Sequence, residues 1–292
     1  MSDNLNTICP TDRKLTKEKT KIIFLKIVRY FVLTVIAIIL AFPFFLLVSR
    51  SFMSEMDINA ARIWPSEWTF DNYKTIFEKN NYLLYTWNTL KVVACNMVLV
   101  PVSASLCAYS FSRLKWKGRE TVFACVLSTI MIPGTVLQIP LYVMFYNFGW
   151  LGTLKPLIIP AAFGGGAINI FLLRQFMRSI PKEMDEAAIV DGANAFRRYL
   201  IILPLCSPIL VYIVVGTFAA GWSDFFGPLI YLSERNTYTL AVVIYQDSLA
   251  SDLSGANLKM AAGAFMALFP AVLFVLYQRK LVDGIMIGAV KG

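Results

Sequence analysis

Residues 181–205 read PKEMDEAAIVDGANAFRRYLIILPL, a polar stretch that stands between two long apolar runs. Its first half carries Glu183, Asp185 and Glu186 shortly after Pro181. Proline suits the first helical position, where its missing N–H is not needed, and acidic side chains are favoured at the positive end of the helix dipole. We therefore expect a short helix to begin near Pro181.

The second half of the stretch predicts a reversal of the chain and another helix. Gly192 follows the first helix, and glycine takes a positive φ without steric cost, which ends a helix and turns the chain. Residues 193–199 then form a second short helix. Four residues of the first helix share a narrow face: Met184, Ala187, Ala188 and Asp191. Its two alanines would let a partner backbone approach closely, although a merely solvated connector is the alternative.

The composition places this stretch in a membrane protein. Of the 292 residues, 58% are hydrophobic and 15% are charged, against roughly 25% charged residues in soluble domains. A membrane-spanning helix needs about 20 mostly apolar residues. Six segments qualify: residues 30–48, 90–111, 121–146, 156–173, 200–220 and 260–277. The predicted fold class is an all-α integral membrane protein with six transmembrane helices.

The distribution of basic residues predicts the orientation. Lys and Arg are enriched in cytoplasmic loops near helix ends, and 19 of the 27 fall before the first span, at 113–119, at 174–198 and after the last span. Both termini and the opening stretch are therefore expected in the cytoplasm. This asymmetry accounts for the net charge of +9, so no nucleic-acid partner is expected.

The spans divide the chain into four parts. Residues 1–49 form a cytoplasmic tail and the first span, and 50–89 form an extracytoplasmic segment. Residues 90–280 form a core of five spans with a cytoplasmic loop at 178–200, and 281–292 form a C-terminal tail. Within the third span, Pro133 and Pro140 are expected to kink the helix. The three glycines at 164–166 would allow close packing or leave room in a cavity.

Enzymatic chemistry is not expected. The chain has no histidine, and its five cysteines form no C-x-x-C pair, so zinc ligation and a thiol–imidazole pair lack their residues. No phosphate-binding loop of the G-x-x-x-x-G-K-[ST] type occurs. We expect no ATP site, metal or other cofactor bound by this chain.

A family resemblance follows from the opening stretch. The run from Glu186 to Ala188, then Gly192, then the I-x-L-P ending at 201–204 resembles the EAA loop of permease subunits of ATP-binding-cassette (ABC) importers. Further similar motifs extend from about residue 65 to 292, including PSEWTFDNYKTIF, AYSFSRLKWKGR and QRKLVDGIMIGAVKG. The chain resembles carbohydrate-importer permeases, the half related to the smaller maltose permease subunit. Eight residues separate Gly192 from the I-x-L-P ending, one fewer than usual, which leaves the facing of Arg197 and Arg198 open.

The resemblance implies an ABC importer permease fold and a coupling element. Glu186 would be the polar contact to a cytoplasmic ATPase, Ala187 and Ala188 the close-packed face, and Gly192 the turn. Asp191 is also counted among the residues that couple to the ATPase. Gly288 and Lys291 of the C-terminal tail would also lie near the ATPases, unless the tail is disordered.

The resemblance also implies partners and a location. The partners are a homologous second permease, two ATPase subunits or an ATPase homodimer that use ATP with Mg, an extracytoplasmic solute-binding protein, a carbohydrate substrate and the lipid bilayer. The location is the bacterial cytoplasmic (inner) membrane. The alternatives outside this family are a non-transport membrane scaffold and a secondary carrier, although the spans contain almost no charged residues for ion coupling.

Candidate substrate-path residues follow from residue type and depth. Aromatic faces and amides bind sugars, and five residues of these types are placed at suitable depth: Asn96, Gln138, Tyr142, Asn169 and Trp222. An interfacial aromatic belt is the alternative for the tryptophan. Hydrogen bonds between helices are the alternative for Gln138 and Asn169.

Overall fold

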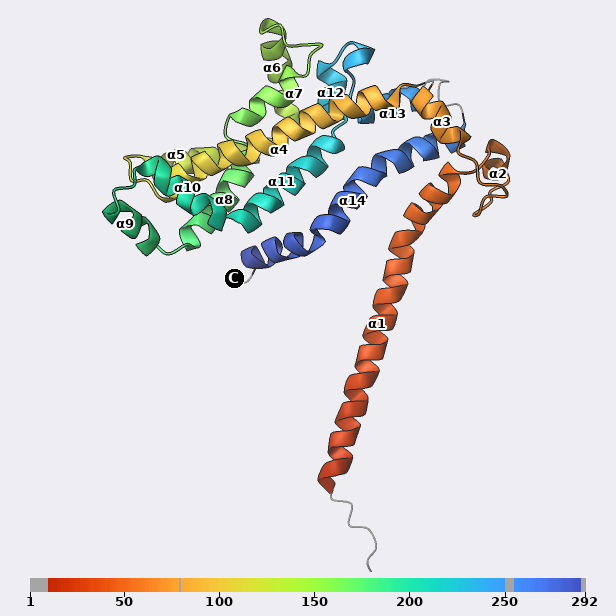
Figure 1. The fold of residues 1–292 in the computed structure, drawn as a ribbon, viewed down its shortest axis with the longest axis horizontal. Coiled ribbons are helices and arrows are strands. Elements are labelled where there is room, and N and C mark those ends of the chain that lie inside the picture. The colour runs from red at the N-terminus through yellow and green to blue at the C-terminus, as the bar shows by residue number, and fades with distance from the viewer. Residues whose placement is uncertain (1–9, 79, 250–254, 290–292) are drawn as a thin grey trace, which may run out of the picture.

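The computed structural model describes residues 10–78, 80–249 and 255–289, and for 10–22 and 279–289 it describes the course of the helix alone. Helices and turns make up this described part, which contains no β-strand. The longer helices are α1 (Pro10–Ser51), α4 (Tyr82–Ser112), α5 (Arg119–Ser128), α6 (Gly134–Asn147), α8 (Ala167–Ser179), α10 (Ala195–Leu205), α11 (Ser207–Trp222) and α14 (Ala256–Ala289) (Figure 1). The predicted all-α fold is confirmed.

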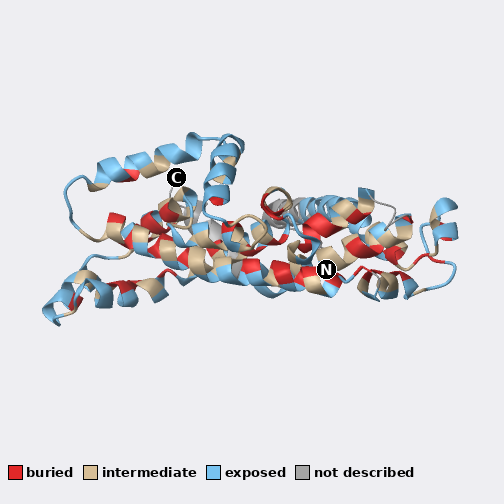
Figure 2. Cartoon of the chain, turned by 90° about the horizontal axis from the view of Figure 1, so that it is seen from above, coloured by how far each residue is buried: buried red, intermediate tan, exposed pale blue. Residues whose placement is uncertain are grey.

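Helix α4 is the central element of the bundle. It packs against α8 and α11 along its length, and α14 packs against α11 on the other side. Figure 2 shows the buried residues concentrated in these central helices, with exposed residues around them. Helix α1 contacts α14 and then leans away from the bundle (Figure 1). Its residues 23–45 are exposed.

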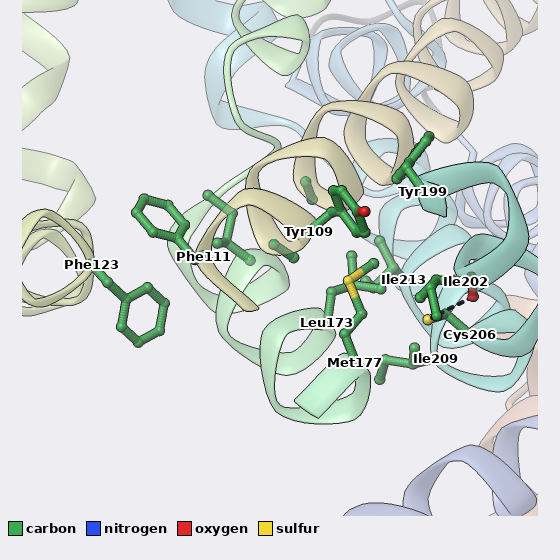
Figure 3. Packing of buried hydrophobic residues seen from close by; sticks show 13 residues of the cluster. Tyr109, Phe111, Phe123, Leu173, Met177, Tyr199, Ile202, Cys206, Ile209 and Ile213 are labelled. Atoms are coloured by element: carbon green, nitrogen blue, oxygen red, sulfur yellow. Dashed lines mark hydrogen bonds between the residues drawn. The ribbon is translucent and has the colours of Figure 1, made fainter. Parts of the chain in front are cut away.

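One apolar core lies at the end of the bundle that carries α9 (Glu183–Val190). Figure 3 shows Leu173 and Met177 of α8 pointing toward Ile209 and Ile213 of α11. Tyr109 of α4 completes this core, with its ring 5.5 Å from the ring of a tyrosine on α10. The core ties α4, α8, α10 and α11 into one unit.

A second apolar core lies at the opposite end of the bundle. It joins α4, α11 and α14 to two short helices, α3 (Asp71–Glu78) and α13 (Leu240–Leu249). Trp222 is 1% exposed there, and its ring lies 4.6 Å from that of Phe269. The Trp222 Nε1 donates to the carbonyl of Met266 at 2.9 Å, so the indole has its hydrogen bond inside the core.

Among the residues that the structure describes, four helical segments are long and apolar enough to span a membrane, and two bent pairs bring the number to six if each pair is one span. The four segments correspond to the predicted spans at 30–48, 90–111, 156–173 and 260–277. The predicted span 156–173 is nevertheless not one helix, because a non-helical break at residues 163–166 separates α8 from two shorter elements. The predicted third span, 121–146, is not one helix. It breaks at Pro133 between a 3₁₀ turn (Thr129–Met131) and α6, with a bend of 100°. The expected kink at Pro133 is confirmed, while Pro140 lies within α6.

The predicted fifth span, 200–220, is also not one helix. It divides at Cys206 into α10 and α11, which meet at 77°. Pro208 has no N–H to donate, and its ring crowds the carbonyl four residues earlier, at Pro204. The two prolines therefore end α10 and start α11 in a new direction. Cys206 is buried at this bend, and its Sγ donates to the carbonyl of Ile202 (Figure 3).

The segments expected between the spans are largely helical. The first outer segment contains α2 (Glu55–Asn59) and α3, and the second contains α12 (Phe226–Tyr231), a 3₁₀ turn (Arg235–Thr237) and α13. Two short elements, α7 (Lys155–Ile158) and a 3₁₀ turn (Ile159–Ala162), precede α8. At the termini, α1 begins at Pro10 within the expected tail, and α14 continues to Ala289 past the expected span.

Candidate functional site

The polar stretch at 181–205 folds as the expected helix-turn-helix. Helix α9 begins at Glu183, two residues later than predicted, with Lys182 as its N-cap. Pro181 lies outside the helix, and Ile180 before it is extended with ψ 135°, as is usual for a residue that precedes proline. The first turn of α9 still carries its three acidic residues at the positive end of the helix dipole.

Gly192 ends α9 in the left-handed conformation, with φ +76°. The N–H of Ala193 donates to the carbonyl of Ala188 at 2.9 Å, and the N–H of Gly192 donates to the carbonyl of Ile189 at 2.9 Å. These two bonds are those of a Schellman motif, which closes the last turn of a helix and reverses the chain. The turn predicted at Gly192 is confirmed.

Helix α10 starts at Ala195 and continues to Leu205, so it is longer than the predicted piece at 193–199. Asn194 caps it, because its Oδ1 accepts the N–H of Arg197 at 2.9 Å. Tyr199 of α10 hydrogen-bonds Ser105 of α4 through their hydroxyl oxygens at 2.9 Å. The second helix of the motif is thereby fixed on the central helix of the bundle.

An ion pair fixes the first helix of the motif on the same element. Arg113, the C-cap of α4, places its Nη1 2.7 Å from the Oδ2 of Asp185 in α9. Its Nη2 donates to the carbonyl of Ile180 at 2.8 Å and to that of Met177. The sequence did not point to this pair, because its residues are 72 positions apart.

A second ion pair lies beside this one. Arg174 of α8 is 3% exposed, and its Nη2 lies 2.6 Å from the Oε2 of Glu120 in α5. Its Nε donates to the carbonyl of Phe111 at 3.1 Å, and its Cζ lies 3.9 Å from the centroid of the Phe123 ring. The guanidinium is therefore both paired and stacked, and it holds α5 against α4 and α8.

The residues predicted to contact an ATPase lie on both sides of α9. Glu186, Ala187, Asp191 and Gly192 are exposed, whereas Ala188 is 7% exposed and packs inside the chain. The expected face with both alanines open to a partner is therefore wrong, because only Ala187 is open. Ala188 instead lies on the side of the helix that its own chain covers.

Large apolar side chains complete the exposed surface of the motif. Val190 is 87% exposed, Ile189 is 54% exposed and Phe196 is 61% exposed. Exposed apolar groups of this size are typical of interaction sites when they lie together. Sequence reasoning missed them, although an apolar residue in a segment expected to face water is a usable signal.

A cleft of about 1080 Å³ lies between α9 and the segment at 113–120. Basic side chains dominate its lining, and Glu186 and Asp185 lie among them. The basic residues are Arg113, Lys115, Arg119, Arg178, Lys182 and Arg198. The cleft presents charged and apolar groups together beside the exposed surface of α9.

A second cavity, of about 840 Å³, lies along α4, α8 and α11. Two predicted substrate-path residues, Asn96 and Asn169, line it together with Tyr212 and Asp224. The Nδ2 of Asn96 donates to the carbonyl of Leu157 at 3.0 Å, and the Nδ2 of Asn169 donates to that of Gly165 at 2.7 Å. Both amides thus have a partner in the chain, and each keeps its oxygen as an acceptor.

The other three predicted path residues lie away from this cavity. Trp222 belongs to the second apolar core and is not among the residues that line the cavity. Gln138 and Tyr142 lie on α6, which points away from the central helices (Figure 1). The structure therefore brings together two of the five predicted residues.

Of the two C-terminal residues predicted to lie near the ATPases, the structure describes one. Gly288 lies in the last turn of α14, while Lys291 lies outside the described residues.

The fold and sequence are similar to those of known transport proteins. Residues 101–286 match the family model of the binding-protein-dependent transport system inner membrane component. The galactooligosaccharides transport system permease protein GanQ of Bacillus subtilis is 31% identical over 269 residues, 90% of this chain and 94% of that protein. The lactose transport system permease protein LacG of Rhizobium radiobacter is 31% identical over 267 residues, 91% of this chain and 96% of that protein.

A solved structure has the same fold. It is a chain of a bacterial ABC transporter involved in the import of the acidic polysaccharide alginate, with a TM-score of 0.76 and 19% sequence identity. The match covers 94% of this chain and 99% of that one. A sequence of low identity to this one therefore adopts the same overall fold.

Proposed function

The chain belongs to the family of binding-protein-dependent transport system inner membrane components, and on that premise we propose that it is the permease subunit of an ATP-driven importer of sugars or oligosaccharides. The observation that carries this proposal is the match over residues 101–286, which includes the helix-turn-helix at 181–205. The carbohydrate class rests on the relatives, whose names specify galactooligosaccharides and lactose.

Helix α9 is the proposed contact to a cytoplasmic ATPase. Its exposed surface combines the Glu186 carboxylate, the small Ala187 and the apolar Ile189 and Val190. A surface of this kind fits into a groove, because the apolar groups bury area while the carboxylate pairs with a basic residue of the partner. The ATPase would bind ATP with Mg, and two copies of it would drive the permease between outward and inward openings.

The second proposed partner is a homologous permease. The cavity that Asn96 and Asn169 line is not enclosed, as half of a translocation path would be. Helix α6 extends from the bundle after the bend at Pro133 with Tyr142 exposed, and the apolar residues 23–45 of α1 are also uncovered. A second permease subunit would cover these surfaces and complete the path.

The third proposed partner is an extracytoplasmic solute-binding protein. It would bind at the end of the bundle opposite α9, where α2, α3, α12 and α13 replace simple loops. In this orientation α9 and both termini face the cytoplasm, in agreement with the excess of basic residues on that side. The membrane would be the bacterial cytoplasmic membrane.

Co-purification tests the proposed coupling. The wild-type chain is expected to bring down an ATPase pair, and Glu186→Lys is expected to lose it because the charge at the contact is reversed. Glu183→Lys, in the same helical turn and also exposed, is the control and should retain the ATPases. If ATPase binding survives Glu186→Lys combined with Ala187→Trp, the assignment of α9 is wrong.

Uptake measurements separate the importer from its alternatives. Vesicles that contain the complete complex are expected to take up sugar only with ATP inside and the binding protein outside. A secondary carrier would instead transport with a proton gradient alone, and a membrane scaffold would transport nothing. Either outcome would overturn the proposal.

A further inference from the structure

Three separate helical elements meet at one side chain at the α9 end of the bundle. Arg113 caps α4, and its guanidinium bonds the carbonyls of Met177 and Ile180 at the end of α8 and the carboxylate of Asp185 in the first turn of α9. The planar guanidinium donates in fixed directions. It therefore sets the position of α9 relative to α4 and α8 and holds these elements together.

The ion pair between Arg113 and Asp185 is enclosed. The Arg113 side chain is 5% exposed and that of Asp185 is 12% exposed. The neighbouring pair of Arg119 and Glu120 is 26% and 60% exposed. Water screens an enclosed pair less, and opening it would leave the largely buried Asp185 carboxylate without its partner. The Arg113–Asp185 contact is thus the one of the two that stays closed when a force acts on α9.

Asp185 has no second anchor in the described part of the chain. Its Oδ1 is buried without a hydrogen-bond partner among the described residues, and so is the Nε of Arg198, the next guanidinium in the same cleft. Arg113 is therefore the group that holds the carboxylate. Removing either charge of the pair would release the first turn of α9 from α4.

Helix α4 connects this contact with the cavity. Its residues Asn96 and Val100 line the 840 Å³ space, and its last turn precedes Arg113. A helix can carry a displacement along its length, so a displacement applied at α9 reaches α4 directly through this joint while the joint is closed. We propose that Arg113 and Asp185 form a fixed joint that transmits the motion of α9 to α4, as positioning residues for transport. This inference rests on the proposed function.

The test uses the complete complex of the chain with its second permease, ATPases and binding protein in vesicles. The decisive variant is Asp185→Asn, which keeps the shape of the side chain and leaves Arg113 bonded to the two carbonyls. The matched control is Glu183→Gln, which removes one charge from the same first turn of α9 but has no bond to α4 among the described residues. Both variants are measured for sugar uptake, ATP hydrolysis and retained ATPase.

For Asp185→Asn we expect the sugar taken up per ATP hydrolysed to fall at least tenfold, with the ATPases retained. Glu183→Gln should stay within twofold of the wild type. Arg113→Gln should lower the sugar taken up per ATP hydrolysed as much as Asp185→Asn does. In the double variant this ratio should be at most twofold lower than in the more impaired single variant, because the effects of residues that act as one unit are not additive.

Several results would contradict the proposal that Arg113 and Asp185 form a fixed joint. If Asp185→Asn keeps the uptake-to-hydrolysis ratio within twofold of the wild type, the pair transmits no motion. If the Asp185→Asn complex fails to assemble, the pair serves assembly alone. If the effects of the two single variants multiply, the residues act separately. A wild-type complex that transports without hydrolysing ATP would instead overturn the proposed function itself, and the variants are not needed to see it.

Discussion

A Cβ atom on Gly165 would lie 2.4 Å from the carbonyl oxygen of Val100. Gly165 has φ +63°, and it lets the turn before α8 approach the backbone of α4 beside the cavity. Any side chain there would meet backbone, which has to move as a whole, and would also adopt the left-handed conformation. Of the two roles expected for the glycines at 164–166, Gly165 has the first, because it allows close packing against α4.

Gly165→Ala is therefore expected to destabilise the protein by about 2 kcal/mol or more, from overpacking and backbone strain together. Thermal unfolding of the purified protein in detergent measures the change. The matched control is Gly216→Ala, because Gly216 lines the same cavity and an added Cβ would meet nothing within 4 Å. Equal unfolding temperatures for the two variants would contradict the prediction.

The hydrogen bond between Tyr199 and Ser105 predicts an asymmetric response to mutation. In Tyr199→Phe, the Ser105 hydroxyl keeps its bond to the carbonyl of Val102, 2.9 Å away, so the expected loss is about 1 kcal/mol or less. In Ser105→Ala, the buried Tyr199 hydroxyl loses its partner, which costs about 1–3 kcal/mol. The unfolding temperatures of the two variants and of the double variant show whether Ser105→Ala destabilises the protein more than Tyr199→Phe does. A larger loss in Tyr199→Phe would be inconsistent with this bonding.

The apolar periodicity and the local chain chemistry predicted much of this fold. The positions of the six apolar segments, the helix start near Pro181, the turn at Gly192 and the break at Pro133 follow from neighbouring residues, because helix ends and spans are set by short-range preferences. Pro204 and Pro208 indicate the bend at Cys206, but the length of the apolar run predicts one helix.

The long-range contacts could not be predicted in this way. Arg113 and Asp185 are 72 residues apart, and a single sequence does not indicate which of several basic residues meets an acidic one. The burial of Ala188 depends on which side α9 turns toward the rest of the chain, and neighbouring residues do not fix that side. Trp222 has the residue type of a sugar contact, yet apolar neighbours in its core cover its ring and the carbonyl of Met266 accepts its N–H.

The first outer segment, which contains α2 and α3, is expected to respond to acid through Asp57. The hydroxyl of Ser66 donates to both carboxylate oxygens of Asp57, at 2.7 and 2.8 Å, and these bonds are the main cause that lowers the pKa of Asp57 below its usual 3.8. A lowered pKa in the folded state stabilises the segment above the usual pKa, and this contribution is lost as the pH falls through the lowered value. The segment should therefore open only below about pH 3.8.

Pepsin, which is active in acid, measures this opening by cleavage in the segment at 55–71 between pH 2 and 5. Ser66→Ala should bring the pKa of Asp57 closer to 3.8, so cleavage begins at a higher pH. Glu55→Gln is the control, because the exposed Glu55 has no bond to this cluster. The same onset of cleavage in Ser66→Ala and the wild type would show that the hydroxyl does not hold the carboxylate.

Gly192 is the residue at which backbone conformation and the proposed coupling meet. Its φ of +76° places it in the left-handed region, and a Cβ added there would meet nothing within 4 Å. The effect of a substitution is therefore conformational and not steric. Asparagine adopts this conformation readily, alanine costs about 1 kcal/mol, and a β-branched valine costs more.

We therefore expect ATPase retention and sugar uptake to fall in the order Gly192, Gly192→Asn, Gly192→Ala, Gly192→Val, because the loss of the Schellman turn misplaces α9. Hydrogen exchange at the N–H groups of Gly192 and Ala193 measures the turn itself. Gly149→Val is the matched control, since Gly149 has φ +64°, has nothing within 4 Å of an added Cβ and ends α6 at a distance in sequence from α9. If Gly149→Val lowers ATPase retention as much as Gly192→Val does, general strain and not the position of α9 causes the loss.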